Sequence, residues 1–307
     1  MKNQMTSMYL KYLIVFTVAM RVCISEGNCP KKFWHKEEHT ACLEKSPKLM
    51  ESMFVSENDK NAIVNMHNAY RSSVKPPACN MFKMYWDNEL AYIAQKWADN
   101  CEYKHDESSR RSIPLKYSVG QNIAAGFPNW ENVIYAWHSE GKNYKFGDKR
   151  MKNSGHYTQI VWSTSLLIGC GASRCSFIGM LYVCNYAPAG NTYGQDPYRR
   201  CRTQRPLNDC GNSPCYNFGT LNRLDCSCHC LNYHQIHGPR CMINCSYSDP
   251  IFPCRLRTHD SCKYTNVRPT CPWLCEECNG GFLSRRTNLV LLCAAHILRI
   301  ITYSDYH

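Results

Sequence analysis

The chain has 307 residues, a formal net charge of +12 and 22 cysteines. So many cysteines exclude an ordinary protein of the reducing cytosol, and we expect a secreted, extracellular chain with structural disulfides. Basic clusters at 142–152 and 198–205 favour acidic partners such as anionic lipid headgroups, sulfated glycans or acidic protein faces. We do not expect nucleic acid as a partner, because no stacking motif is interleaved with the basic runs.

Residues 1–25 have the pattern of a removable signal peptide. Lys2 and Lys11 flank the start of an apolar run that ends near Ser25, a plausible cleavage position. The run is too short to span a bilayer, so it predicts secretion.

A second apolar stretch lies within the tail 279–307, whose role the sequence does not define. The stretch contains His296 and Arg299 and is also shorter than a membrane span. A lipid-anchor signal is one interpretation, but charge inside such a signal is costly, so we favour a poorly structured tail. We therefore predict no transmembrane span.

Cysteine density divides the chain between leader and tail. Without Cys23 and Cys293, twenty cysteines remain, an even number that permits complete pairing. Seven lie within 26–200 and thirteen within 201–278, so the first part can bury a core while the second needs disulfides for stability. The proline-containing, basic stretch 197–209 is predicted to be the hinge.

Three helices are expected in the first part, over 56–73, 86–101 and 129–140. The first begins with capping residues, and in the second Asp87 can cap a clear apolar face. The third places Glu140 on the same face as Val133 and Trp137.

The following stretches are expected to complete the domain. A short helix at 155–162 precedes two strands, 166–172 and 177–186, which are joined by a turn at 173–176. Earlier in the chain, the pattern of 118–126 is typical of a loop followed by a helix. This order predicts an α+β fold, with helices covering a sheet.

No HExxH, GxSxG or phosphate-binding glycine motif is present. The candidate site residues are isolated polar groups: His105, Gln121, Glu140 and His156. If the second helix continued for one more turn, His105 would share a face with Cys101. Each residue alone is more often a hydrogen-bonded structural group, and spacing cannot show that four segments converge.

Four segments resemble the hallmark motifs of the CAP superfamily of cysteine-rich secretory, antigen 5 and pathogenesis-related proteins. They are "HNAYR" (67–71), "MYWDNELAYIAQKWADNC" (84–101), "GHYTQIVWSTS" (155–165) and "LYVCNYAPAGN" (181–191), in the family's order. The resemblance covers about 57–196 and implies a secreted, three-layer α-β-α sandwich, preceded here by an N-terminal extension at 26–56.

The resemblance also implies a central cleft lined by two histidines and two acidic residues. The histidines fall on His105 and His156 and one acidic residue on Glu140, but the other position is Gln121. An amide cannot take a proton at neutral pH, so half of the acidic pair is missing. Two histidines imply at most a weak Zn²⁺ site, because zinc sites normally use three or four protein ligands.

Disulfides and modules follow from resemblance in the same way. The family pattern implies Cys101–Cys175 and Cys170–Cys184. The cysteines of 210–241 resemble an EGF-like module, with Leu221 where a cysteine is usual and Cys230 as an extra. The cysteines of 245–278 resemble a ShKT module, which implies Cys245–Cys278, Cys254–Cys271 and Cys262–Cys275. Cys29, Cys42, Cys79 and Cys201 then remain in one of three pairings, of which we favour Cys29–Cys42 because these two are close in sequence.

The resemblance favours a secreted binding protein for lipids, sterols, an extracellular receptor or an ion channel. A metal-dependent extracellular peptidase is the first alternative, in which Glu140 would be the general base. A purely architectural extracellular protein is the second, because EGF-like modules are often spacers.

Overall fold

The computed structural model describes residues 29–33, 38–148, 152–232, 236–249, 254–258, 261–262, 267–275 and 278. The predicted signal peptide and the apolar tail at 279–307 lie outside these residues. Among the described residues, no helix is both long and apolar enough to cross a membrane.

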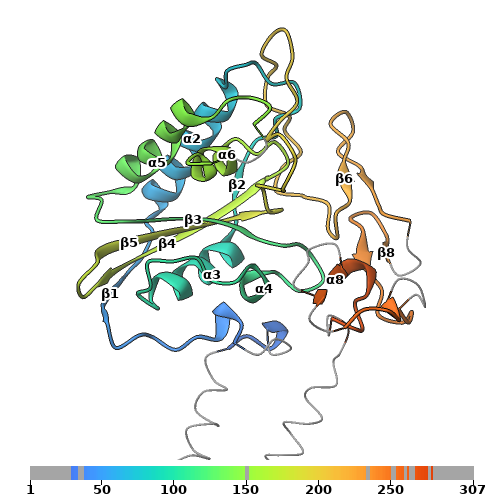
Figure 1. Ribbon diagram of the computed structural model, residues 1–307, viewed down its shortest axis with the longest axis horizontal. Helices are drawn as coiled ribbons and strands as arrows, with labels where there is room; N and C mark the ends of the chain where they lie inside the picture. Colours follow the sequence, from blue (N-terminus) through green and yellow to red (C-terminus); the bar gives the residue numbers. More distant parts are fainter. Residues whose placement is uncertain are drawn as a thin grey trace, which may run out of the picture.

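A five-stranded sheet occupies the centre of the first part (Figure 1). Its strands are β1 (Leu49–Met53), β2 (Tyr85–Trp86), β3 (Gly120–Ala125), β4 (Leu167–Cys175) and β5 (Gly179–Ala187). The order is β1-β4-β5-β3 with antiparallel neighbours, and β2 pairs with β4 in parallel. Cys170 and Cys184 face each other across β4 and β5 and are joined by a disulfide.

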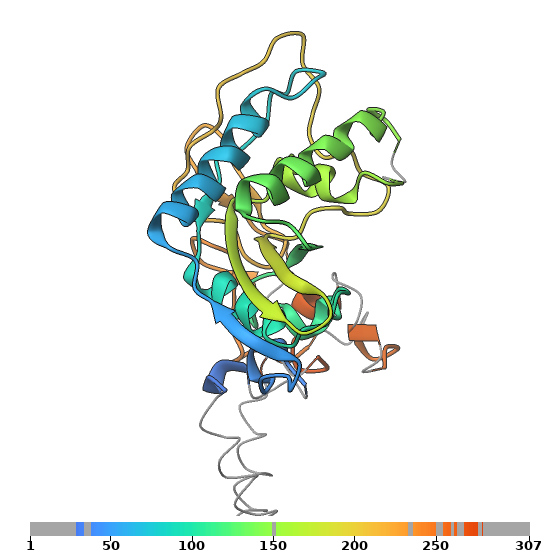
Figure 2. The ribbon, with the colours of Figure 1, turned by 90° about the vertical axis from the view of Figure 1, so that its left-hand side faces the viewer.

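Helices cover both faces of this sheet, which confirms the predicted α-β-α sandwich (Figures 1 and 2). On one face lie α2 (Glu57–Ser72), α5 (Trp130–Ser139) and α6 (Gly155–Ile160); on the other lie α3 (Asn88–Ala98) and α4 (Ser108–Arg111). Short 3₁₀ helices complete this part: η2 (Lys31–Phe33), η3 (Thr40–Cys42) and η4 (Glu140–Asn143).

The three long helices begin where side-chain caps satisfy free backbone N–H groups. The side chains of Ser56, Asp87 and Asn129 each accept a hydrogen bond from the backbone N–H three residues on. Apolar faces then bury against the sheet, as α3 does with Leu90 and Ile93. The predicted helices are therefore confirmed, as is the short helix at α6.

Two glycines in β4 allow α3 to approach the sheet closely. A Cβ atom at Gly169 would collide with the backbone of α3 at Asp87 and Ala91, and one at Gly171 would collide with Gln95. The helix backbone thus lies directly on the strand, which no larger residue would permit.

Three local predictions are wrong. Residues 118–126 contain strand β3 rather than a loop and helix, and its residues Gly120–Ala124 are buried on both faces, so no polar alternation marks it. The β4 strand continues through the predicted turn as far as Cys175, and the turn follows it. The helix predicted over 86–101 ends at Ala98 and does not reach Cys101, which has a left-handed conformation with φ 55°. His105 therefore lies in the loop that follows.

The predicted hinge, 197–209, lies along residues 77–83. Cys201 N–H donates to Pro77 O at 2.8 Å, and Asn208 N–H donates to Met81 O at 2.8 Å. The disulfide Cys79–Cys201 adds a covalent link. The chain that leads out of the sandwich is thus fixed to its surface.

The cysteine-rich part, orange to red in Figure 1, lies beside the sandwich. It contains β6 (Thr220–Leu221) paired with β7 (Cys228–His229), β8 (Ile236–His237) paired with β9 (Met242–Ile243), and α8 (Val267–Thr270). Asn217 N–H donates to Lys116 O at 2.6 Å, and the rings of Tyr117 and Tyr216 lie 5.7 Å apart, so backbone and side chains both hold the segment 210–241 against the sandwich.

All twenty cysteines between 29 and 278 form disulfides. The six pairings expected above are present. With Cys29 joined to Cys42, the two remaining cysteines form the disulfide Cys79–Cys201. Within 210–241 the pairs are Cys210–Cys226, Cys215–Cys228 and Cys230–Cys241. Such complete pairing fits an oxidising, extracellular environment.

Candidate functional site

The structure brings the four candidate residues together as two hydrogen-bonded pairs. His105 lies in the loop after α3, Gln121 in β3, Glu140 where α5 passes into η4, and His156 in the first turn of α6. His105 contacts Gln121, and His156 contacts Glu140. Asn122, next to Gln121 in β3, donates from Nδ2 to His156 O at 3.1 Å, so the two pairs lie on neighbouring segments of the fold.

The His156–Glu140 pair is held by two hydrogen bonds. His156 donates from Nδ1 to Glu140 Oε1 at 2.7 Å and from its backbone N–H to Glu140 Oε2 at 3.0 Å. Each side chain is 28% exposed, so the pair borders solvent. The Trp137 ring stacks on the imidazole with centroids 5.8 Å apart and fixes its plane.

Gln121 links His105 to a buried carboxylate that sequence reasoning did not single out. Its Nε2 donates to Asp106 Oδ1 at 3.0 Å, and its Oε1 accepts from His105 Nδ1 at 2.8 Å. Asp106 also pairs with Arg111, whose Nη1 lies 2.7 Å from Oδ1. The only sequence signal for Asp106 was its position next to His105.

The hydrogen bonds determine which imidazole nitrogens carry protons. An ionised carboxylate only accepts, so the amide nitrogen of Gln121 faces Asp106 and its oxygen faces His105. The neutral His105 ring must then donate from Nδ1, and the same holds for His156 against Glu140. In its neutral form each ring therefore keeps an unprotonated Nε2, the arrangement by which partners orient metal-ligating histidines.

The surroundings shift the pKa values of His105 and Glu140. Loss of water from the protein-facing side of the ring lowers the pKa of His105, although the hydrogen bond with Gln121 opposes this. Burial raises the pKa of Glu140, but the hydrogen bonds from His156 outweigh burial and leave that pKa below its usual value. At neutral pH, His105 is therefore neutral and Glu140 is ionised.

The donor set fits a metal only in part. The two Nε2 atoms are suitable zinc ligands, but in the described part of the chain no group of three or more His, Cys, Asp or Glu side chains is arranged to hold a metal. The carboxylate oxygens of Glu140 are occupied by His156. Two protein ligands would give modest affinity, with solvent in the remaining positions.

Comparison with known proteins bears on residues in and around this site. The model of the cysteine-rich secretory protein (CAP) family matches residues 64–186, which include all four candidate residues. Among similar proteins are cysteine-rich secretory protein 3 of Homo sapiens, 35% identical over 62% of this chain and 83% of that protein, and a cysteine-rich venom protein of Conus textile, 32% identical over 82% of this chain and 90% of that protein.

Venom allergen 5 of Tityus serrulatus is 33% identical over 73% of this chain, which spans 56% of the length of that protein. The similarity to the human and cone-snail proteins extends over most of the length of those two proteins. The four motifs, the sandwich and these relatives agree: the chain belongs to the cysteine-rich secretory protein family, the CAP family.

Proposed function

We propose that this protein is a secreted binding protein whose CAP cleft, at His105, Glu140 and His156, contacts a lipid or sterol, while the cysteine-rich segments contact an extracellular receptor or ion channel. The observation that supports the proposal is that the polar side chains of the site are already hydrogen-bonded to one another. Both oxygens of Glu140 accept hydrogen bonds, and Gln121 replaces the second acid with an amide that is itself engaged on both sides. Such groups suit recognition better than proton transfer.

Exposed aromatic side chains support a lipid partner. Phe177 at the β4–β5 turn and Phe54 after β1 are more than 90% exposed, and the chain carries a net charge of +12. Apolar side chains on a basic protein favour association with anionic lipid surfaces, because apolar burial in the membrane interface and attraction between opposite charges both strengthen binding.

The test is vesicle flotation with the full disulfide-bonded chain. Vesicles of phosphatidylcholine alone, with cholesterol, and with phosphatidylserine separate a sterol partner from an anionic surface. We expect saturable binding to one of the latter two, weakened in His156→Ala if the cleft is involved. Absence of binding to all three vesicles would contradict the lipid part of the proposal, and absence of pulldown from cell-surface extracts would contradict the receptor part and leave the architectural alternative.

A metal-dependent peptidase is the second candidate, favoured by one observation. Glu140 is ionised at neutral pH and contacts His156, so a carboxylate adjoins a potential zinc ligand. A bound zinc ion would supply Lewis acidity. Glu140 would have to release a hydrogen bond from His156 before it accepted a proton.

Zinc-dependent cleavage of a broad peptide library would test the peptidase. Glu140→Gln would keep the shape of the side chain and remove the base, so activity should vanish, whereas Glu107→Gln, on the exposed start of α4, should leave it unchanged. Cleavage that persists in Glu140→Gln, or no cleavage in the native chain with zinc, would overturn this candidate.

A further inference from the structure

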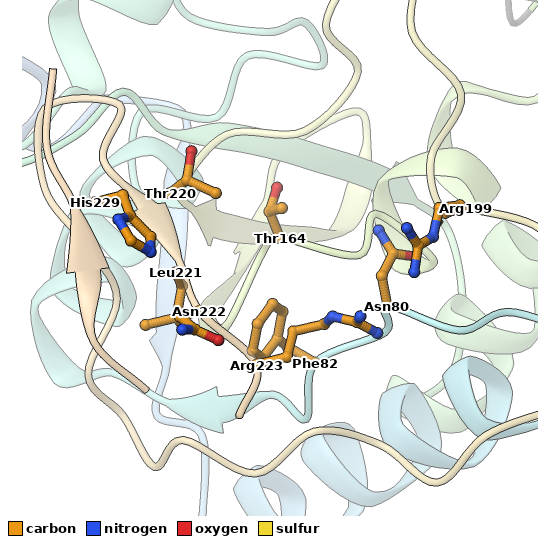
Figure 3. Close-up of a pocket in the computed structure, with 9 residues that line it drawn as sticks. All are labelled: Asn80, Phe82, Thr164, Arg199, Thr220, Leu221, Asn222, Arg223 and His229. Atoms are coloured by element: carbon orange, nitrogen blue, oxygen red, sulfur yellow. The ribbon is translucent and has the colours of Figure 1, made fainter. Parts of the chain in front are cut away.

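A cavity of about 460 Å³ lies between the sandwich and the first cysteine-rich segment (Figure 3). The sandwich and the segment after it supply Phe82, Thr164 and Arg199, and the β6–β7 hairpin region supplies Thr220, Leu221 and Arg223. The volume falls within the range of small-molecule sites, about 300 to 1,000 Å³. None of these residues belongs to the His105–His156 cleft.

The two sides of the cavity are fixed relative to each other. The disulfide Cys79–Cys201 holds the connecting segment, and Lys83 Nζ lies 3.1 Å from Asp209 Oδ2 at the entrance to the cysteine-rich part. Arg223 reaches across and donates from Nη1 to Cys79 O. The cavity is thus preformed, which reduces the entropy cost of binding a ligand.

Two guanidinium groups make the cavity cationic. Figure 3 shows the Arg223 side chain extending towards Asn80, with Arg199 beyond it. Arg199 Nε contacts Cys79 Sγ at 3.3 Å, and Arg223 uses Nη1, so other N–H groups of both side chains remain for a ligand. No residue that the structure places in the cavity wall is acidic, so nothing there neutralises the two charges.

The remaining wall combines apolar and hydroxyl-bearing side chains with the amides of Asn80 and Asn222 and the imidazole of His229. Phe82 is 3% exposed and forms part of the floor together with Leu221, while the exposed Thr164 and Thr220 bring hydroxyl groups to the rim. Apolar floor, hydroxyl rim and forked cations match a ligand with a ring face, hydroxyl groups and a multi-oxygen anion. A sulfated sugar has all three, and arginine binds such oxyanions through paired hydrogen bonds.

We propose that the cavity between the CAP sandwich and residues 210–241 binds a sulfated saccharide, with Arg199 and Arg223 on the sulfate. Two basic residues of the connecting segment, Arg200 and Arg205, extend the positive surface along which a longer sulfated chain would continue. This site goes beyond the lipid and receptor contacts proposed above and does not depend on them.

The test is calorimetric titration of the full disulfide-bonded chain with a sulfated tetrasaccharide of the heparin type. We expect the double variant Arg199→Gln with Arg223→Gln to weaken binding by at least about tenfold, because each charge-assisted hydrogen bond contributes that much. Thr164→Glu leaves the contacts of both arginines intact and adds a carboxylate at the rim, so it should weaken binding comparably. Arg202→Gln is the matched control: it removes the same charge three residues from Arg199, outside the cavity, and should change affinity less than twofold.

Ligand controls separate the possible sources of the effect. The unsulfated tetrasaccharide, inorganic sulfate and an acidic hexapeptide should each bind at least tenfold more weakly than the sulfated sugar. Equal losses in Arg202→Gln and the double variant, full binding by Thr164→Glu, or binding of sulfate alone or of the peptide as tight as that of the sugar would overturn the proposal. His105→Ala should leave the titration unchanged, so failure here is distinguishable from failure of the CAP-cleft proposal.

Discussion

The side-chain amide of Gln121 donates a hydrogen bond to the buried carboxylate of Asp106 across 3.0 Å. The CAP resemblance places an acid at position 121, but an ionised glutamate there would face Asp106 with like charge. The amide resolves this conflict, because it donates to Asp106 and accepts from His105. The absence of a second acid in the cleft is thus matched to the residue behind it.

Gln121→Glu should therefore destabilise the protein at neutral pH. We expect a loss of about 1 to 3 kcal/mol in the free energy of unfolding at pH 7, since a buried donor is replaced by a like charge. The loss should shrink as the pH falls towards 4 and the new carboxyl group is protonated. Urea unfolding with intact disulfides at both pH values measures it, and equal stability of variant and native chain at pH 7 would contradict the role of the Gln121–Asp106 contact.

Zinc affinity should depend on both imidazoles. His105→Ala and His156→Ala should each lower the affinity by at least about tenfold in calorimetric titration, because either change leaves one protein ligand. Protonated histidine is no ligand, and the pKa of His105 lies below its usual value, so His105 should remain a competent ligand at slightly acid pH. His138→Ala removes a histidine outside the pair and should have no effect.

The Glu140–His156 pair should stabilise the fold above acidic pH. Because the pKa of Glu140 is lowered, its contribution is present above the ordinary glutamate value, about 4.3, and is lost as pH falls through the folded value. Glu140→Gln keeps one acceptor oxygen, so we expect a loss of about 1 kcal/mol at pH 7, where the site is partly screened by solvent. The difference should vanish near pH 3; a constant difference from pH 7 to 3 would point to packing instead of charge.

Arg71 is the most highly bonded side chain in the core. It is fully buried, burial lowers its pKa to about 9, and its guanidinium donates to five backbone carbonyls, those of Phe82, Ile160, Trp162, Ser163 and Ser165. Lysine has three donors on a single atom and cannot reach all five. Arg71→Lys should cost at least about 3 kcal/mol in urea unfolding, since buried carbonyls would be left unpaired. Arg174→Lys, at the exposed end of β4, should cost almost nothing, and similar losses in both would contradict the role of Arg71.

Sequence patterns predicted what depends on local chemistry. The helix starts at Ser56, Asp87 and Asn129 follow from caps within three residues of the N–H groups they satisfy. Strand β3 was missed because Gly120–Ala124 are buried on both faces and lack alternation. Strand β1 was missed because no residue of Leu49–Met53 is fully buried and the segment shows no alternation.

The site depended on a different kind of information. No periodicity brings four segments together: His105, Glu140 and His156 stood out only as single polar groups, and the family resemblance alone joined them into one site. Asp106 has no motif of its own, because its contact with Gln121 arises only when the loop after α3 folds back on β3. A departure from a family motif thus indicates where to search for a compensating residue, but not which one it is.

His67 should make stability depend on pH between about 4 and 6.5. Its ring is fully buried, donates from Nδ1 to Ile63 O at 2.8 Å and accepts at Nε2 from the Tyr186 hydroxyl at 3.0 Å. Burial lowers the pKa of His67 to about 4, whereas the unfolded chain has an ordinary histidine near 6.5. Below 6.5 the unfolded state therefore binds a proton that the folded state does not, so acidification favours unfolding by about 3 kcal/mol by pH 4. His67→Gln removes the titrating group, and the free energies of unfolding of native chain and variant should converge by that amount between pH 7 and 4. If the free energies of unfolding of the two proteins instead fell in parallel over this range, His67 would be protonated as easily in the folded protein as in the unfolded one. The hydrogen bond from the Tyr186 hydroxyl to Nε2 would then not keep the ring neutral.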